Sequence, residues 1–116
     1  MKILIVDDDP AIRMLYKEEL EDEGYSVIVA STGEEALKLF DNENPDIVTL
    51  DILMPGMDGI QVLRHMKDKN PKLPVIMSTA YDYRDDFAVW ASEAYIVKSA
   101  DLTQLKETIK QLAGDK

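Results

Sequence analysis

The stretch from Pro45 to Gly59, PDIVTLDILMPGMDG, decides the fold that the rest of the chain must follow. Its first part, Ile47 to Leu50, is a short apolar run with β-branched residues, which is typical of a strand buried on both faces. Asp51 follows directly. Pro55-Gly56 then predicts a loop, because this pair continues neither a strand nor a helix. We therefore expect Asp51 where a buried strand meets a loop, and ligands bind outside such strand ends in open parallel α/β sheets.

Short apolar runs alternate with amphipathic segments along the whole chain. Strands are predicted at Lys2 to Val6, Tyr25 to Ala30, Ile47 to Leu50, Pro74 to Ser78 and Ala94 to Val97. The first predicted helix starts at the N-cap Asp9-Pro10 and ends at a glycine cap, Gly24; the second starts at the capping box Thr32 to Glu35 and ends before a loop from Asn42 to Pro45. The third runs from Gly59, with Asp58 as its N-cap, to Asn70. Two more are predicted from Asp82 to Ser92 and from the cap Asp101 through Leu112. This alternation predicts a three-layer α/β/α fold with a five-stranded parallel sheet.

Length, charge and cysteine content narrow the class of protein. The chain has 116 residues, which we interpret as one domain. A net charge of −10 argues against a nucleic-acid footprint, which needs a basic patch. Cysteine is absent, which excludes disulfides and thiolate metal sites. No apolar run is long enough for a signal peptide or a membrane span, so we expect a cytoplasmic protein.

One edge of the predicted sheet gathers polar side chains, because right-handed crossovers place every strand's carboxyl end there. Asp7 and Asp8 end the first strand, Asp51 the third, Thr79 the fourth and Lys98 the fifth. Converging carboxylates repel one another. A hard divalent cation such as Mg²⁺ would relieve that repulsion, and a phosphoryl group would fit between the metal and the lysine.

With these residues in place, the whole chain resembles the receiver domain of two-component response regulators. The resemblance rests on four motifs in order: Ile5-Val6-Asp7-Asp8, Leu50-Asp51 with Met54 to Gly59, Ser78-Thr79-Ala80, and Tyr95 to Lys98. It implies a CheY-like, flavodoxin-like fold of strand order 2-1-3-4-5 over residues 1–116.

The resemblance also implies a mechanism of signalling. Asp51 would accept a phosphoryl group from a histidine kinase or a histidine phosphotransfer protein, and Lys98 would pair with a phosphoryl oxygen. Thr79 would bind another oxygen, and Tyr95 would move inward and change the face formed by the fourth helix, fifth strand and fifth helix. Such a protein assists its own phosphorylation and dephosphorylation and is otherwise not an enzyme.

The resemblance likewise implies a ligand set and partners. Mg²⁺ would be bound by Asp8, Asp51 and the backbone carbonyl of Leu53, with Asp7 acting mostly through water. A downstream protein target is expected rather than nucleic acid or membrane, since no output domain follows the last helix in this sequence. The expected oligomeric state is a monomer or a weak, phosphorylation-dependent dimer.

The chain departs from the usual receiver pattern at several positions. Ser99 follows Lys98 where the family usually has Pro, and the span from Thr79 to the last strand is short. Leu53 and Tyr81 occupy the two positions that flank the approach of water to the phosphorylated residue. Neither is an acid or amide, so we expect slow dephosphorylation.

Three alternatives remain open from the residues. A flavodoxin-like electron carrier would share the fold and acidity, but Asp7-Asp8-Asp9 would repel a flavin phosphate. A metal-dependent phosphatase with an aspartyl nucleophile typically has a second acid two residues on, where this chain has Leu53. A degenerate receiver could act as a constitutive binding module, although Asp8, Asp51, Thr79 and Lys98 argue against it.

Overall fold

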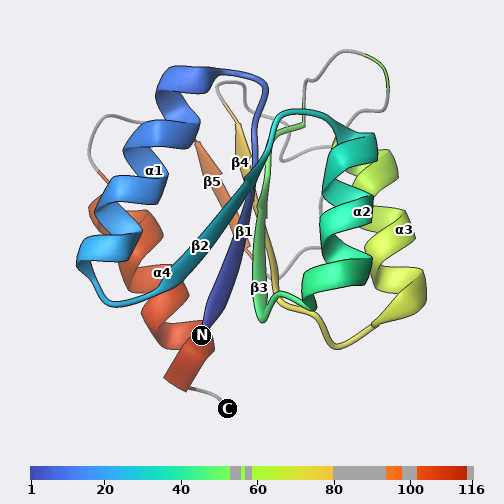
Figure 1. The fold of residues 1–116 in the computed structure, drawn as a ribbon. Helices are drawn as coiled ribbons and strands as arrows, with labels where there is room; N and C mark the ends of the chain where they lie inside the picture. Colours follow the sequence, from blue (N-terminus) through green and yellow to red (C-terminus); the bar gives the residue numbers. More distant parts are fainter. Residues whose placement is uncertain (53–55, 57–58, 80–93, 98–101, 115–116) are drawn as a thin grey trace.

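Within the residues that the computed structural model describes (1–52, 56, 59–79, 94–97 and 102–114), five parallel strands form one sheet. The strands are β1 (Lys2–Val6), β2 (Ser26–Ala30), β3 (Ile47–Leu50), β4 (Val75–Thr79) and β5 (Ala94–Val97). Their order across the sheet is β2-β1-β3-β4-β5. This is the predicted order, and every carboxyl end lies on the same edge (Figure 1).

Helices cover both faces of the sheet. Helices α1 (Pro10–Asp22) and α4 (Thr103–Gly114) lie on one face, and α2 (Gly33–Glu43) and α3 (Gly59–Lys69) lie on the other (Figure 1). The predicted three-layer α/β/α architecture is therefore confirmed.

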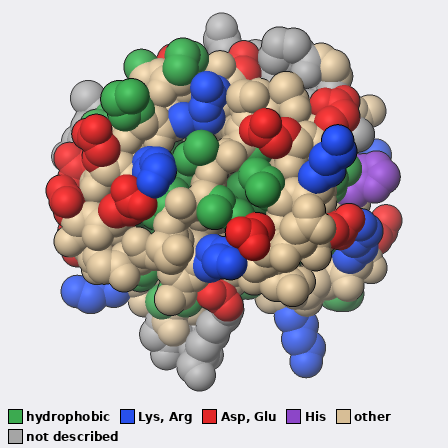
Figure 2. Space-filling model, in the orientation of Figure 1, with side chains coloured by type: hydrophobic (Ala, Val, Ile, Leu, Met, Phe, Trp, Pro, Cys, Tyr) green, Lys and Arg blue, Asp and Glu red, His purple; other side chains and the backbone are tan. Residues whose placement is uncertain are grey.

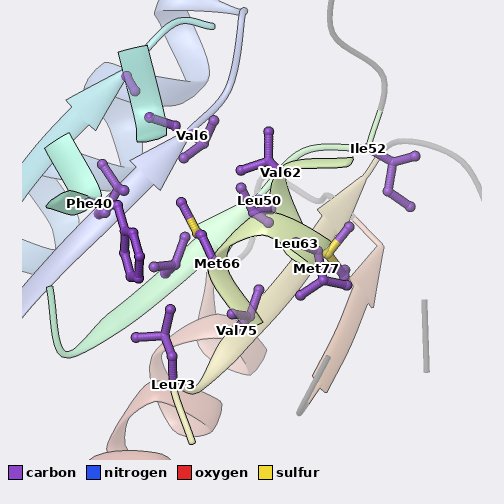
Figure 3. Packing of buried hydrophobic residues seen from close by; sticks show 14 residues of the cluster. Val6, Phe40, Leu50, Ile52, Val62, Leu63, Met66, Leu73, Val75 and Met77 are labelled. Carbon is purple, nitrogen blue, oxygen red and sulfur yellow. The ribbon is translucent and has the colours of Figure 1, made fainter. Parts of the chain in front are cut away.

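The sheet divides the core into two clusters because successive strand residues point to opposite faces. On the α2 and α3 side, alternate residues of the central strands pack against the two helices; Figure 3 shows Val6, Leu50, Val75 and Met77 from strands with Phe40, Val62, Leu63 and Met66 from helices. On the other side, Ile3, Ile5 and Ile76 pack against α1 and α4. Burial on both faces explains why Ile3 to Val6 is a continuous apolar run and why β3 is apolar apart from Thr49.

The predicted capping residues of α1 and α2 act as caps. The Asp9 side chain accepts the Ala11 N–H at 2.9 Å, and Pro10 takes the first helical position. The Thr32 hydroxyl oxygen accepts the Glu35 N–H at 3.1 Å. Glu35 in return accepts the N–H of Ser31 at 2.8 Å, so the reciprocal bond of this capping box reaches one residue before the cap.

Several predicted boundaries were wrong by one or two residues. Strand β2 begins at Ser26 rather than Tyr25, and β4 runs one residue later than predicted. Helix α2 continues through Glu43, two residues into the predicted loop, and ends where Asn44 adopts φ 47°. Asparagine tolerates this left-handed conformation, so the helix ends there rather than at Asn42. The caps predicted at Asp58 and Asp101, and the helix predicted at 82–92, lie outside the described residues.

An ion-pair cluster joins α1 to α4. Lys106 Nζ lies 2.8 Å from Glu19 Oε2 and 3.6 Å from Glu23 Oε1. The hydrogen bond to Glu19 raises the pKa of Lys106 above its ordinary value. This exposed contact links the two helices on their face of the sheet and adds little to stability.

The described surface carries mixed charge. On the face shown in Figure 2, acidic and basic side chains are interspersed. Among the described residues, no helix is both long and apolar enough to cross a bilayer.

Candidate functional site

Three carboxylates meet at the carboxyl edge of the sheet. Asp7, Asp8 and Asp51 each offer one oxygen, and these oxygens all lie within 4.8 Å of one another. Asp7 is 2% exposed and Asp51 is 5% exposed, whereas Asp8 is exposed to solvent. The structure thus brings together the three acids that the sequence places at two strand ends.

The register of the sheet fixes the backbone positions of the two buried acids, Asp7 and Asp51. Val6 and Leu50, the last residues of β1 and β3, are paired across the sheet. Asp7 and Asp51 are the next residue on each strand, so they emerge side by side. The Asp51 N–H donates to the Val6 carbonyl at 2.9 Å, and the Asp7 N–H donates to the Ala30 carbonyl at 3.1 Å. The acids are therefore held at the rim of a rigid sheet rather than on a free loop.

The start of helix α1 and its N-cap residue also bind Asp7. The Asp9 N–H donates to Asp7 Oδ1 at 2.9 Å. The guanidinium of Arg13 donates from Nη1 to the backbone carbonyl of Asp7 at 2.7 Å. The sequence analysis did not identify Arg13; its position one turn into α1, five residues after an acidic pair, is the signal that could have suggested it.

This donor set fits a hard divalent cation. Ionised carboxylates at this spacing bring like charges close together, and partial burial weakens the screening by water. Oxygen ligands of this kind suit Mg²⁺. The cluster therefore has the chemistry expected of a magnesium site.

The other predicted site residues are located in part. Thr79 is the last residue of β4, and it pairs in register with Val97 of β5. Lys98 follows Val97 directly in the sequence. The Thr79 backbone therefore lies at the same edge as the acids. The side chains of Thr79 and Tyr95, and all of Leu53, Tyr81 and Lys98, lie outside the described structure.

Comparison with known proteins assigns this arrangement to a family. Residues 3–110 match the family model of the response regulator receiver domain. The chain belongs to the response regulator receiver domain family. The match covers the sheet edge with all three acids, so the family assignment and the geometry agree.

Individual relatives extend this result. The receiver is 37% identical to sporulation initiation phosphotransferase F of Bacillus subtilis, over 95% of this chain and 91% of that protein. It is 45% identical to the alkaline phosphatase synthesis transcriptional regulatory protein PhoP of the same organism, over 73% of this chain. The receiver covers only 35% of PhoP's length.

Solved structures show the same fold. The response regulator protein TrrA of Thermotoga maritima, in complex with Mg²⁺-BeF, superposes with a TM-score of 0.93 at 48% identity, covering 96% of this chain and 97% of that one. TrrA in complex with the histidine kinase ThkA gives a TM-score of 0.90 over the same shares of the two chains. A receiver 48% identical to this one has thus been solved both with a magnesium complex and with a kinase.

Gly59 has a role that the sequence analysis missed. Its N–H donates to the Ile52 carbonyl at 2.8 Å, which pins the start of α3 against the backbone that follows Asp51. A Cβ at position 59 would lie 2.0 Å from the carbonyl oxygen of Asp51 and 2.9 Å from Cα of Ile52. Only glycine allows this approach. The helix start and the acid are therefore one packed unit.

We predict that Gly59→Ala displaces the backbone of Asp51 and lowers the free energy of unfolding by about 3 kcal/mol, the upper part of the range for overpacking. Gly24→Ala is the matched control. Gly24 has φ +96° but nothing within 4 Å of an added Cβ, so that variant meets backbone strain alone, roughly 1 kcal/mol. Urea unfolding of both variants makes the comparison. Equal losses of unfolding free energy in the two variants would show that the Asp51 backbone accommodates the added methyl group without a measurable energetic penalty.

We also predict that Asp51→Asn raises the melting temperature in EDTA, because it removes one charge from a cluster of three. Saturating Mg²⁺ should shrink the difference, since a ligand that binds only the folded wild type stabilises it by mass action. Asp68→Asn, at an exposed position of α3, should change neither value. A lower melting temperature of Asp51→Asn in EDTA would contradict the crowding of these carboxylates.

Proposed function

We propose that this receiver is a phosphoacceptor of a two-component or phosphorelay pathway, and that Asp51 is the residue phosphorylated. The observation that carries the proposal is the meeting of Asp7, Asp8 and Asp51 at the carboxyl edge of the sheet. Asp51 directly follows the central strand β3 and is almost fully buried, and one of its neighbours in the cluster, Asp8, is exposed. A carboxylate at the carboxyl edge of a parallel sheet lies where such folds bind ligands.

The proposed reaction transfers a phosphoryl group from a phosphohistidine. A carboxylate oxygen of Asp51 attacks phosphorus, an O–P bond forms, and the P–N bond of the donor breaks. The departing imidazole nitrogen keeps the electron pair of that bond. The carboxylate needs no general base because it attacks without first losing a proton. The chain's contribution is positioning and charge stabilisation, as expected for a loose transition state.

The acidic cluster supports a role for Mg²⁺. We propose that Asp8, Asp51 and the Leu53 carbonyl bind the ion directly and that Asp7 acts mainly through water. When bound, the ion neutralises the charge that accumulates on the phosphoryl oxygens. Asp7 holds the N–H of Asp9 and its own carbonyl binds Arg13, which suits an acid that orients the site rather than one that moves.

Lys98 and Thr79 complete the proposed site. Both follow from the family resemblance, with Lys98 pairing one phosphoryl oxygen and Thr79 donating its hydroxyl to another. The register of β4 and β5 supports this proposal, because it brings the backbone of Thr79 beside Val97, the residue before Lys98. Tyr95 would respond by moving inward, which would change the surface of β5 and its neighbouring helices.

The proposed donor is a histidine kinase or a histidine phosphotransfer protein. TrrA, 48% identical to this receiver, has been solved with a histidine kinase, which supports this class of partner. The start of α1 also supports it. Pro10, Met14 and Val29 line a shallow, mostly apolar hollow there, and Met14 is 64% exposed. A donor that reaches Asp51 past Asp8 would cover this surface.

Other features of the proposal concern the whole protein. We propose that residues 1–116 act as one receiver domain in the cytoplasm, that it assists its own phosphorylation and dephosphorylation, and that its output is contact with a downstream protein. We propose a monomer that dimerises weakly, if at all, on phosphorylation. The family match favours this function over an electron carrier or a phosphatase, and the intact acids favour it over a degenerate binding module.

We predict that acetyl phosphate with Mg²⁺ adds the mass of one phosphoryl group to the wild type and none to Asp51→Asn. Asp8→Ala should lose both Mg²⁺ binding, measured by calorimetry, and most of the mass gain, because a hard cation loses a charged ligand. Asp68→Asn is the control and should react as wild type does. Intact-mass spectrometry gives the result, and a full mass gain in Asp51→Asn would refute the assignment of the phosphoacceptor.

We predict a long-lived phosphorylated state. Hydrolysis needs a water in line with the O–P bond, and Leu53 and Tyr81 offer no acid or amide to orient it. Each ~1.4 kcal/mol of lost stabilisation slows that step about tenfold. Leu53→Asn with Tyr81→Glu should therefore shorten the lifetime, while Lys110→Glu, on the exposed side of α4, should not. A phosphate-release time course in which the double variant decays no faster than wild type would disprove this role.

A further inference from the structure

A buried hydrogen bond joins α1 to the carboxyl end of β4. Tyr16 Oη lies 3.1 Å from Ser78 Oγ, and either hydroxyl can be the donor. Tyr16 is 2% exposed and Ser78 is 3% exposed. The bond spans 62 residues of sequence, so it connects two elements that are far apart in the chain.

Packing alone does not account for these two hydroxyls. Ser78 lies on the same face of β4 as Ile76, which packs in the cluster with Tyr16 and Leu20. An apolar side chain would suit that face equally well. A buried hydrogen bond between hydroxyls contributes only about 1 kcal/mol net to stability. Such a pair therefore specifies one geometry more than it adds stability.

The other end of this connection is the acidic cluster. Tyr16 lies three residues after Arg13, so both share one face of α1. Arg13 holds the carbonyl of Asp7 at the end of β1, and Tyr16 holds Ser78 at the end of β4. Strand β3, which Asp51 follows directly, lies between β1 and β4 in the sheet. One turn of α1 therefore bridges the strands on either side of Asp51.

We propose that Tyr16 and Ser78 are positioning residues for phosphoryl transfer. Ser78 directly precedes Thr79, the last residue of β4. By fixing Ser78 to α1, the hydrogen bond sets how far the Thr79 backbone lies from the acids that α1 also holds. The inference rests on the proposed function, in which Thr79 binds a phosphoryl oxygen. It adds to that function the hydrogen bond that sets the distance between the Thr79 backbone and the acids.

The test is a double-mutant cycle on the rate of phosphorylation by acetyl phosphate. Tyr16→Phe and Ser78→Ala each remove one hydroxyl, and the double variant removes both. We expect each single variant to lower the rate constant at saturating acetyl phosphate about tenfold, since small misplacements are costly in such reactions. Because the pair acts as one unit, the double variant should be no slower than the slower single variant. The Mg²⁺ dissociation constant should stay within about twofold of wild type, because the acids are retained.

Tyr25→Phe is the matched control. Tyr25 is a partly buried tyrosine that packs against the same cluster, but it lies just before β2, at the opposite edge of the sheet. The Tyr25→Phe variant should be phosphorylated by acetyl phosphate at the wild-type rate. All rates are measured well below the melting temperature of every variant. If Tyr16→Phe does not fold, Ser78→Ala with the same control carries the comparison.

The outcomes are distinguishable. A wild type that gains no phosphoryl group would defeat the proposed function itself. If the wild type is phosphorylated and both Tyr16→Phe and Ser78→Ala react as fast as the wild type, the positioning role alone is overturned. A lowered melting temperature with an unchanged rate constant would assign the hydrogen bond to folding only and would also overturn it. Rate losses that multiply in the double variant would show that the two hydroxyls do not act together.

Discussion

Repulsion among three carboxylates is the constraint on which the rest of this structure depends. Asp7, Asp8 and Asp51 are held with oxygens within 4.8 Å of one another, and two of them are nearly buried. Acids on loops could move away from one another, but acids whose backbones are hydrogen-bonded to neighbouring strands cannot. The backbones of Asp7 and Asp51 are bonded to neighbouring strands, so the repulsion stays until a cation or a charge change relieves it. The rigidity of the sheet keeps the site ready for a ligand.

Two close contacts outside the sheet maintain this arrangement. Gly59 brings the first turn of α3 against the Asp51 peptide from one side of the sheet. Arg13 brings α1 against the Asp7 carbonyl from the other. Both contacts involve backbone atoms of the acids. The helices thus position the backbones of Asp7 and Asp51 from opposite faces of the sheet.

The sequence predicted the layers, the strand order and the meeting of the acids, because hydrophobic periodicity and the chirality of crossovers determine these features. It could not predict contacts that depend on three-dimensional packing. Nothing in the pattern of α1 distinguishes Tyr16, bonded to Ser78, from any other core aromatic residue. The end of α2 was misplaced because Asn42 and Asn44 are equally good terminators by type, and only the backbone shows that Asn44 is the left-handed one.

Helix α1 connects several of these observations, because it is bonded to the ends of two strands and to a second helix. The N-cap residue Asp9 donates its N–H to Asp7. Arg13 and Tyr16 bond the ends of β1 and β4, and the last turns meet α4 through Lys106. One helix therefore contacts both the carboxyl edge of the sheet and α4. For the phosphorylation proposed at Asp51, α1 would be a contiguous physical connection to that distant surface. The two-state element that such a path requires would be the end of β4, where Ser78 is bonded to α1 and directly precedes Thr79, the residue proposed to bind a phosphoryl oxygen.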